Sequence, residues 1–133
     1  MILLNLNTLE LEKMFSSSMG ETFSLFNEIS KSLGLRKLFI TKEVLKPNRR
    51  LSSKHYHTKK EEVFVVLKGN PTLILNNKRK ELRTGDIIAF KPELEEYHTF
   101  ENISEIDVEF LIIANQDIYD EIIYDKNEIN SSR

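Results

Sequence analysis

Short apolar runs of strand length recur along the chain from residue 35 onward. They occupy residues 37–45, 62–67, 72–75, 87–90, 97–100, 106–113 and 121–124. The runs are rich in Val, Ile, Leu and Phe, which favour strands, and turn-forming Gly, Pro and Asn lie between them. Regular short strands with no helices between them predict an all-β sandwich or barrel.

The rest of the chain follows this pattern less clearly. Residues 1–34 are interpreted as an N-terminal arm that packs on the barrel or on a partner subunit, with a strand and a short helical turn expected within residues 1–11. Residues 35–126 form the predicted barrel, and the polar residues 127–133 are expected to be a flexible tail. Between two runs, Asn76-Asn77 predicts a hairpin tip, because Asn tolerates a positive φ.

The run Val63-Phe64-Val65-Val66-Leu67 is apolar at every position, although a half-buried antiparallel strand should alternate. One of its faces is expected to pack into the barrel, with Phe64 and Val66 on the same side. The arm or a second subunit would then cover the other face. Because twofold oligomers are common among soluble proteins, we expect a homodimer.

Composition narrows the function classes. The chain has 133 residues and a net charge of −2, so it fits one domain and lacks the basic surplus of a nucleic-acid binder. It has no cysteine, which excludes disulfides, zinc–thiolate sites and thiol nucleophiles. No apolar stretch is long enough to span a membrane, and the first residues lack the pattern of a signal peptide. We therefore expect a cytoplasmic protein that binds neither nucleic acid nor membrane.

The candidate chemistry lies in the histidines. The chain contains three, and His55 and His57 are two residues apart. On a strand these two imidazoles point to one face and Tyr56 to the other. His98 shares a face with the apolar Phe100. A lone His-X-His pair is weak evidence for a metal, because histidines also serve as surface or hydrogen-bonded core residues.

A carboxylate lies close to the first two histidines in the sequence. Glu62 has the same parity as Phe64 and is expected to face the barrel interior. A buried carboxylate is costly unless a cation accompanies it. Glu61 has the opposite parity, although a bulge would exchange the two. Three imidazoles and one carboxylate suit iron, manganese, nickel, cobalt or zinc, and the ligand set does not choose among these divalent ions.

The spacing of these residues resembles that of a known family. His55-Tyr56-His57, Glu62 after four intervening residues and Gly69 after six more resemble the first motif of the cupins. Gly85-Asp86, His98 and Asn102 resemble the second. The resemblance implies the cupin double-stranded β-helix, a jelly-roll barrel. It also implies that His55, His57, Glu62 and His98 bind one metal ion, and that Asn102 supports a strand end.

Two positions depart from the family pattern. Arg49 stands where the first motif has a glycine, and Asn48 beside it could adopt the left-handed conformation instead. Leu94-Glu95-Glu96 replaces a glycine-containing turn before His98. The longer second motif resembles that of small stand-alone bacterial cupins.

The resemblance implies several functions. Cupins with this ligand pattern include dioxygenases, decarboxylases and isomerases, and also sugar-binding members without catalysis. We predict a metal-dependent enzyme of the oxygenase or isomerase type that acts on a small polar organic molecule inside the barrel. The alternatives are a non-catalytic, sugar-like binder or sensor with a structural metal, and an interaction module whose metal site is vestigial. Arg49 and Arg50 could bind an anionic group of a substrate, or form a solvated surface pair.

Overall fold

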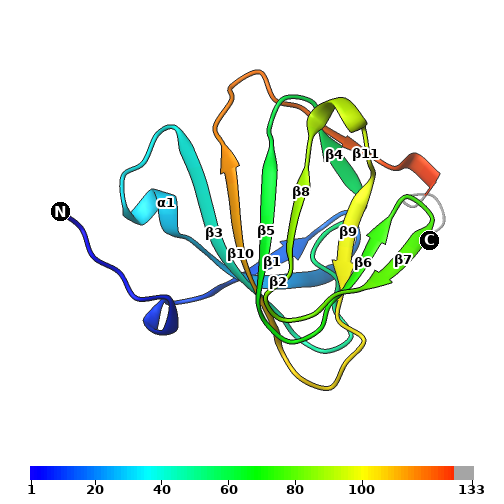
Figure 1. The fold of residues 1–133 in the computed structure, drawn as a ribbon, viewed down its shortest axis with the longest axis horizontal. Helices are drawn as coiled ribbons and strands as arrows, with labels where there is room; N and C mark the ends of the chain where they lie inside the picture. Colours follow the sequence, from blue (N-terminus) through cyan, green and yellow to red (C-terminus); the bar gives the residue numbers. More distant parts are fainter. Residues whose placement is uncertain (128–133) are drawn as a thin grey trace.

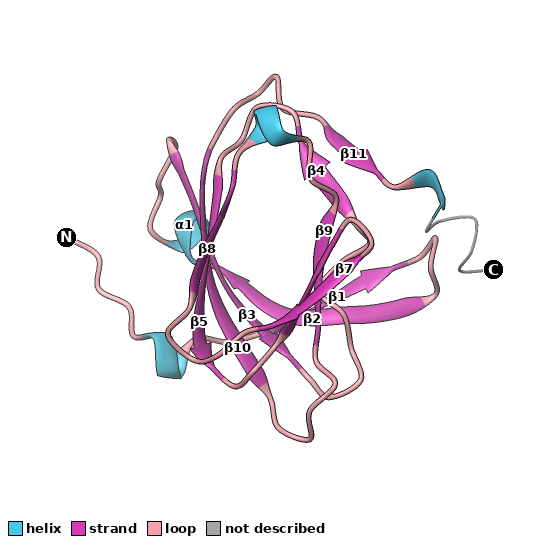
Figure 2. Ribbon diagram, turned by 45° about the vertical axis from the view of Figure 1, so that its right-hand side comes forward, coloured by secondary structure: helices cyan, strands magenta, loops and turns pink. Residues whose placement is uncertain are grey.

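Two antiparallel β-sheets face each other in the computed structural model, which describes residues 1–127 (Figures 1 and 2). The strands are β1 (Glu12–Ser16), β2 (Glu21–Glu28), β3 (Leu38–Leu45), β4 (His55–His57), β5 (Glu62–Lys68), β6 (Thr72–Leu75), β7 (Lys78–Glu81), β8 (Ile87–Phe90), β9 (His98–Glu101), β10 (Val108–Asn115) and β11 (Ile122–Tyr124). Short helical segments are η1 (Leu6–Thr8), α1 (Ile29–Ser32) and η2 (Pro92–Leu94).

The strand order produces the predicted barrel. The larger sheet has the order β1-β2-β3-β10-β5-β8, and the smaller sheet has the order β11-β4-β9-β6-β7. Strands distant in the chain are therefore neighbours: β10 lies between β3 and β5, and β9 lies between β4 and β6. This crossing arrangement confirms the all-β jelly-roll expected from the sequence.

The interior lies between the sheets. In β5 the side chains of Glu62, Phe64 and Val66 are buried, and the residues between them are only half-buried, which confirms the predicted parity. In β10 the buried residues alternate in the same way. The central core consists of apolar side chains from both sheets: Leu45, Leu51, Phe64, Val66, Leu73, Leu82, Phe90, Phe100, Val108, Phe110 and Ile112.

Local turn chemistry agrees with the sequence. Asn76 has φ 53° at the tip of the β6–β7 hairpin, and Asn48 has φ 63°, so both adopt the left-handed conformation expected of them. Gly69 has φ +82°, and a Cβ there would lie 2.8 Å from the backbone oxygen of Asp107, so only glycine fits. The buried Asn102 donates from Nδ2 to the backbone oxygen of Leu45 at 2.9 Å, which confirms its supporting role.

The N-terminal residues contribute more to the sheet than the sequence indicates. β1 pairs with β2, and β2 pairs with β3, so residues of the predicted arm extend the larger sheet. The prediction of a strand within residues 1–11 is wrong, because the only regular element in that range is η1. The predicted tail, residues 127–133, lies outside the described residues apart from Asn127.

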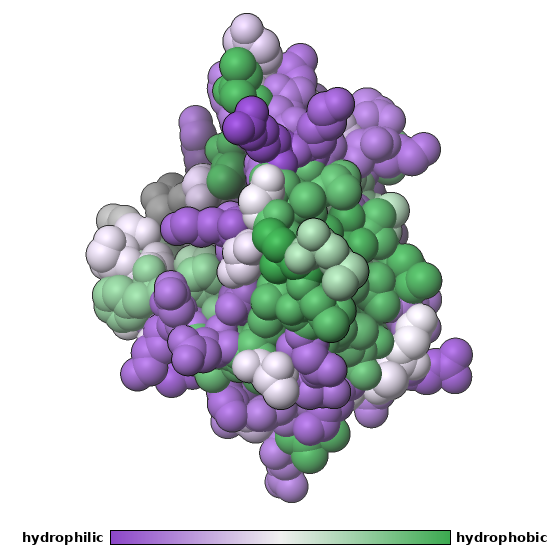
Figure 3. All heavy atoms as spheres, turned by 90° about the vertical axis from the view of Figure 1, so that its left-hand side faces the viewer, coloured by the Kyte–Doolittle hydropathy of each residue, from purple (hydrophilic) through white to green (hydrophobic). Residues whose placement is uncertain are grey.

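Much of the outer face of the larger sheet is apolar, although the ion pair between Lys42 and Glu109 also lies on it. Figure 3 shows a broad hydrophobic surface on the side where α1 and β3 lie in Figure 1. The strand register places Val63 and Val65 of β5 beside Ile113 and Leu111 of β10 on this face, and all four are only half-buried. Ile87 of β8 is 68% exposed. Among the described residues, no helix is long and apolar enough to cross a membrane.

Candidate metal centre

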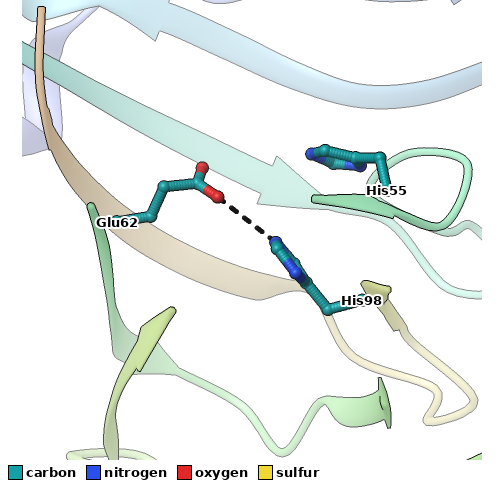
Figure 4. Close-up of side chains that lie close together, drawn as sticks. All are labelled: His55, Glu62 and His98. Carbon is teal, nitrogen blue, oxygen red and sulfur yellow. Dashed lines mark ion pairs between the residues drawn. The ribbon is translucent and has the colours of Figure 1, made fainter. Parts of the chain in front are cut away.

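The four predicted ligands come from both sheets and meet at one end of the interior. His55 and His57 lie on β4, and His98 lies directly opposite His55 on the neighbouring β9. Glu62 reaches toward them from the first position of β5 in the facing sheet (Figure 4). The ligand atoms of His55, Glu62 and His98 all lie within 4.8 Å of one another. His57 adjoins this group, with its Nε2 3.5 Å from Oε2 of Glu62.

Each imidazole is held through its Nδ1 atom. Nδ1 of His55 lies 2.8 Å from the backbone oxygen of Ser53, and Nδ1 of His98 lies 2.9 Å from that of Glu96. A carbonyl oxygen only accepts hydrogen bonds, so Nδ1 carries the proton in both rings. When these rings are neutral, Nε2 is unprotonated, and its lone pair points toward the shared centre. This tautomer is the one that metal-binding histidines adopt.

Two buried polar atoms at the centre have no hydrogen-bond partner among residues 1–127. They are Nε2 of His98 and Oε1 of Glu62, which lie 3.3 Å apart. A neutral His98 would set its Nε2 lone pair against the carboxylate oxygen, and two acceptors repel each other. A cation between them would satisfy both atoms. Donor atoms about 2.0–2.2 Å from a common ion lie at most about 4.4 Å apart, so the observed cluster fits a metal after a small contraction.

The electrostatics of the cluster suit metal binding. Burial, together with repulsion from a protonated His98, lowers the pKa of His55 to about 4, so this imidazole stays neutral at ordinary pH. Burial raises the pKa of Glu62, but the close approach of the imidazoles, that of His98 first, favours the carboxylate and outweighs burial, so this pKa is lowered. The centre therefore offers an ionised carboxylate beside a neutral imidazole.

Sequence reasoning missed one residue that positions a ligand. Asp120, just before β11, accepts a 2.6 Å hydrogen bond from Nδ1 of His57 through Oδ2. Its other oxygen accepts from the backbone amides of Lys59 and Lys60, so one carboxylate ties the end of β4 to the start of β5. Burial raises the pKa of Asp120, but these hydrogen bonds outweigh it and lower the pKa. Nothing in the sequence distinguishes Asp120 from the nearby Asp117.

The ligand cluster forms part of the wall of a cavity of about 510 Å³. His55, Glu62 and His98 line one part of it. The hairpin β1–β2 contributes Met14 and Met19, so residues of the predicted arm help to enclose the cavity. The remaining wall is formed mainly by apolar side chains: Phe23, Phe39, Leu51, Phe64, Phe100, Ile112, Ile122 and Tyr124. The centre is therefore accessible to a small molecule.

The structure does not bring the two predicted substrate arginines to this cavity. Arg50 donates to Oε1 of Glu21 at 2.7 Å, and its guanidinium lies 5.5 Å from the centre of the Phe23 ring. Arg49 donates to the backbone oxygen of Thr22 at 3.3 Å. Both arginines thus contact β2. Their role as substrate contacts stays a prediction, and their observed contacts indicate that they hold β2 in place.

Solved structures of similar fold come from several bacteria. A sugar phosphate isomerase of the cupin superfamily from Silicibacter pomeroyi has a TM-score of 0.83 at 20% identity, over 94% of this chain and 82% of its own. A putative sugar phosphate isomerase from Acidithiobacillus ferrooxidans has a TM-score of 0.82 at 21% identity, over 92% of this chain and 80% of its own. The polyketide cyclase RemF from Streptomyces resistomycificus has a TM-score of 0.75 at 18% identity, over 93% of this chain and 84% of its own. No curated protein matches the chain in sequence.

The sequence itself matches a family profile across the strands that carry the site. The profile is that of the cupin domain, and it covers residues 41–114, from β3 to the end of β10. This range includes the two sequence motifs, the facing sheets and all four candidate ligands. The chain therefore belongs to the cupin family.

Proposed function

We propose that this cupin is a metal-dependent enzyme of the oxygenase or isomerase type that acts on a small organic molecule. The observation that carries the proposal is the pair of partnerless buried atoms, Nε2 of His98 and Oε1 of Glu62, in the wall of a cavity large enough for a substrate. Without a cation, burying these two atoms together would cost free energy with no compensating contact.

One divalent ion would be held by His55, His57, Glu62 and His98. Iron, manganese, nickel, cobalt and zinc all suit this ligand set. When bound, such an ion would supply open coordination positions at which an oxygen atom of a ligand could be polarised. The protein's own groups fix the ligand geometry: backbone oxygens hold His55 and His98, and Asp120 holds His57.

The cavity supports a role in substrate binding. It extends from the ligand cluster along the aromatic side chains of Phe64 and Phe100 to the β1–β2 hairpin. Enclosure of this kind excludes much of the water that would compete for the open positions. The names of the similar structures, isomerase and cyclase, describe conversions of small organic molecules and agree with this reading.

A second candidate function is a non-catalytic binder or sensor with a structural metal. It is favoured by the apolar wall, since apart from the ligand cluster, Glu43 is the only acidic or basic side chain among the described residues lining the cavity. A homodimer and a cytoplasmic location also stay predictions. Under the binder hypothesis, a molecule would co-purify with the protein and be retained unchanged.

Turnover separates the two candidates. Protein loaded with iron, manganese, nickel, cobalt or zinc is incubated with panels of sugars, carboxylates and aromatic alcohols, while oxygen uptake and product masses are recorded. The proposal expects product formation that His98→Gln reduces by at least about 100-fold, because one metal ligand is lost. The enzyme proposal would give way to the binder hypothesis if the protein took up no oxygen, formed no new product and tightly retained a co-purified molecule.

A further inference from the structure

A carboxylate outside the ligand cluster also lines the cavity. Glu43 lies on β3, directly opposite Phe110 of β10, and faces the interior together with the metal-ligand candidates. Oγ of Ser24, on β2, donates to Oε1 of Glu43 at 2.6 Å. Among the described residues this is the only hydrogen bond that the carboxylate receives. Its second oxygen is therefore available to a molecule in the cavity.

Among the described residues that line the cavity, no lysine or arginine offsets the charge of Glu43. Burial therefore raises the pKa of Glu43 to about 7, with the Ser24 hydrogen bond opposing the rise and the charge of Glu62 adding to it. Keeping a carboxyl group in such a place costs stability. A group retained at that cost is a candidate for ligand recognition.

The surroundings of Glu43 define which ligands would fit. Among the described residues that line the cavity, no arginine or lysine would bind an anionic ligand away from the metal centre, and the Glu43 carboxylate would repel it. Phosphate recognition usually relies on arginine, lysine or a helix N-terminus. The aromatic rings of Phe23 and Phe39 and the side chain of Met19 instead offer apolar contact.

We infer that Glu43, positioned by Ser24, binds a hydroxyl group of an uncharged and largely apolar ligand that occupies the same cavity as the metal centre. The inference rests on the proposed function, whose substrate class it narrows. It predicts that this cavity rejects phosphorylated ligands, in contrast to what the names of the two most similar structures reported above would suggest. The hydroxyl donates to the free oxygen of Glu43, and the apolar remainder lies against the aromatic wall.

Three probes with one ring system test the inference: 1-naphthol, 1-naphthyl phosphate and 1-naphthylmethylamine. Binding to the purified protein is measured by isothermal titration calorimetry at about pH 8, above the pKa of Glu43, so that this carboxylate is mostly ionised. We expect 1-naphthol to bind at least about tenfold more tightly than 1-naphthyl phosphate. Tighter binding of either charged probe, or no binding of 1-naphthol at about 1 mM, would overturn the inference.

Variants assign the effect to Glu43. Glu43→Gln should weaken 1-naphthol binding about tenfold, since a hydrogen bond to a charged acceptor is replaced by one to a neutral acceptor. Glu43→Leu, which removes both acceptor atoms and suits the apolar surroundings, should weaken it further. The control is Glu81→Gln on the exposed strand β7, which should leave affinity unchanged. Unchanged affinity in both Glu43 variants would overturn the inference.

Metal content is measured on the same samples. A protein that lacks metal but binds 1-naphthol through Glu43 would refute the proposed metal function and leave the recognition role of Glu43 standing. A metal-loaded protein whose affinity for 1-naphthol does not depend on Glu43 would refute the recognition role of Glu43 and leave the proposed metal function standing. The two failures are therefore distinguishable.

Discussion

The ring of His98 lies parallel to the ring of Phe90, with centroids 3.7 Å apart and an interplanar angle of 4°. In the β5–β8 register, Phe90 is also the direct partner of Glu62. One aromatic residue thus packs on a histidine of the smaller sheet while its backbone pairs with the glutamate of the larger sheet. Phe90 therefore fixes the relative position of two candidate ligands that come from different sheets.

Replacing this ring should loosen the centre. We expect Phe90→Leu to weaken metal affinity several-fold, because His98 gains rotational freedom, and to cost about 1–3 kcal/mol of stability. Phe110→Leu is the matched control: it shortens a core aromatic that contacts Phe64 and Phe100. It should lose similar stability and keep its metal affinity. Competition with a coloured chelator measures affinity, and equal affinities in the two variants would contradict the role of Phe90.

The hydrogen bond between Asp120 and His57 predicts an effect through an acid that binds no metal itself. Asp120→Asn should reduce metal affinity about 10–100-fold, because the orientation and basicity of His57 are no longer fixed. Asp117→Asn changes a nearby acid whose carboxylate, among the described residues, accepts only from the backbone amide of Tyr119, and it should have no effect. If both variants lose metal affinity, the cause is a general effect of charge. If neither variant loses metal affinity, the contact between Asp120 and His57 does not matter for metal binding.

The raised pKa of Glu43 predicts a pH-dependent cost to stability. In the unfolded chain this carboxyl ionises near 4.5, and in the folded protein near 7. Below about pH 4.5 both states are protonated and there is no cost. Between these values the unfolded state alone releases its proton, so stability falls as pH rises, by an amount on the order of 3 kcal/mol, reached above about pH 7.

Urea unfolding of the metal-free protein from pH 4.5 to 8 measures this cost. Glu43→Gln cannot ionise, so its stability relative to the unmodified protein should increase through this range. The difference between the two proteins isolates Glu43 from the histidines, which titrate in both. A constant difference across the range would show that Glu43 ionises equally in both states.

The apolar outer face of the larger sheet supports the predicted homodimer. Val65 and Leu111 lie side by side there, in a broad hydrophobic surface of the kind that can mark a protein interface. Leu111→Lys should shift the protein from dimer to monomer in light scattering coupled to gel filtration. Ile103→Lys, at a position 68% exposed in the loop before β10, should not. A monomer before any substitution would refute the prediction.

Residue parity and turn chemistry made much of the fold predictable. His55, His57 and Glu62 could be placed on inward-facing positions because strand side chains alternate, and Asn48 could be placed in a left-handed turn because few other residues tolerate it. These are local rules, and the structure agrees with them. The motif spacing then joined His98 to residues far from it in the chain.

The residues that sequence reasoning missed depend on contacts between distant segments. Asp120 reaches His57 because β11 pairs with β4, and Glu43 meets Ser24 because β2 joins the edge of β3. Neither pairing is encoded in a local pattern. Arg49 and Arg50 lie close to the ligand strand in sequence, yet they contact β2, because closeness along the chain does not determine the direction of a side chain.

The central claim is that one metal ion binds where Glu62 meets the three histidines. It is tested most directly by elemental analysis of protein purified without an affinity tag, with Glu62→Gln compared to Glu61→Gln at the exposed neighbouring position. We predict about one divalent ion per chain in the unmodified protein and in Glu61→Gln, and almost none in Glu62→Gln. The claim would be contradicted if the unmodified protein took up no metal on reconstitution, or if the two variants had equal metal content.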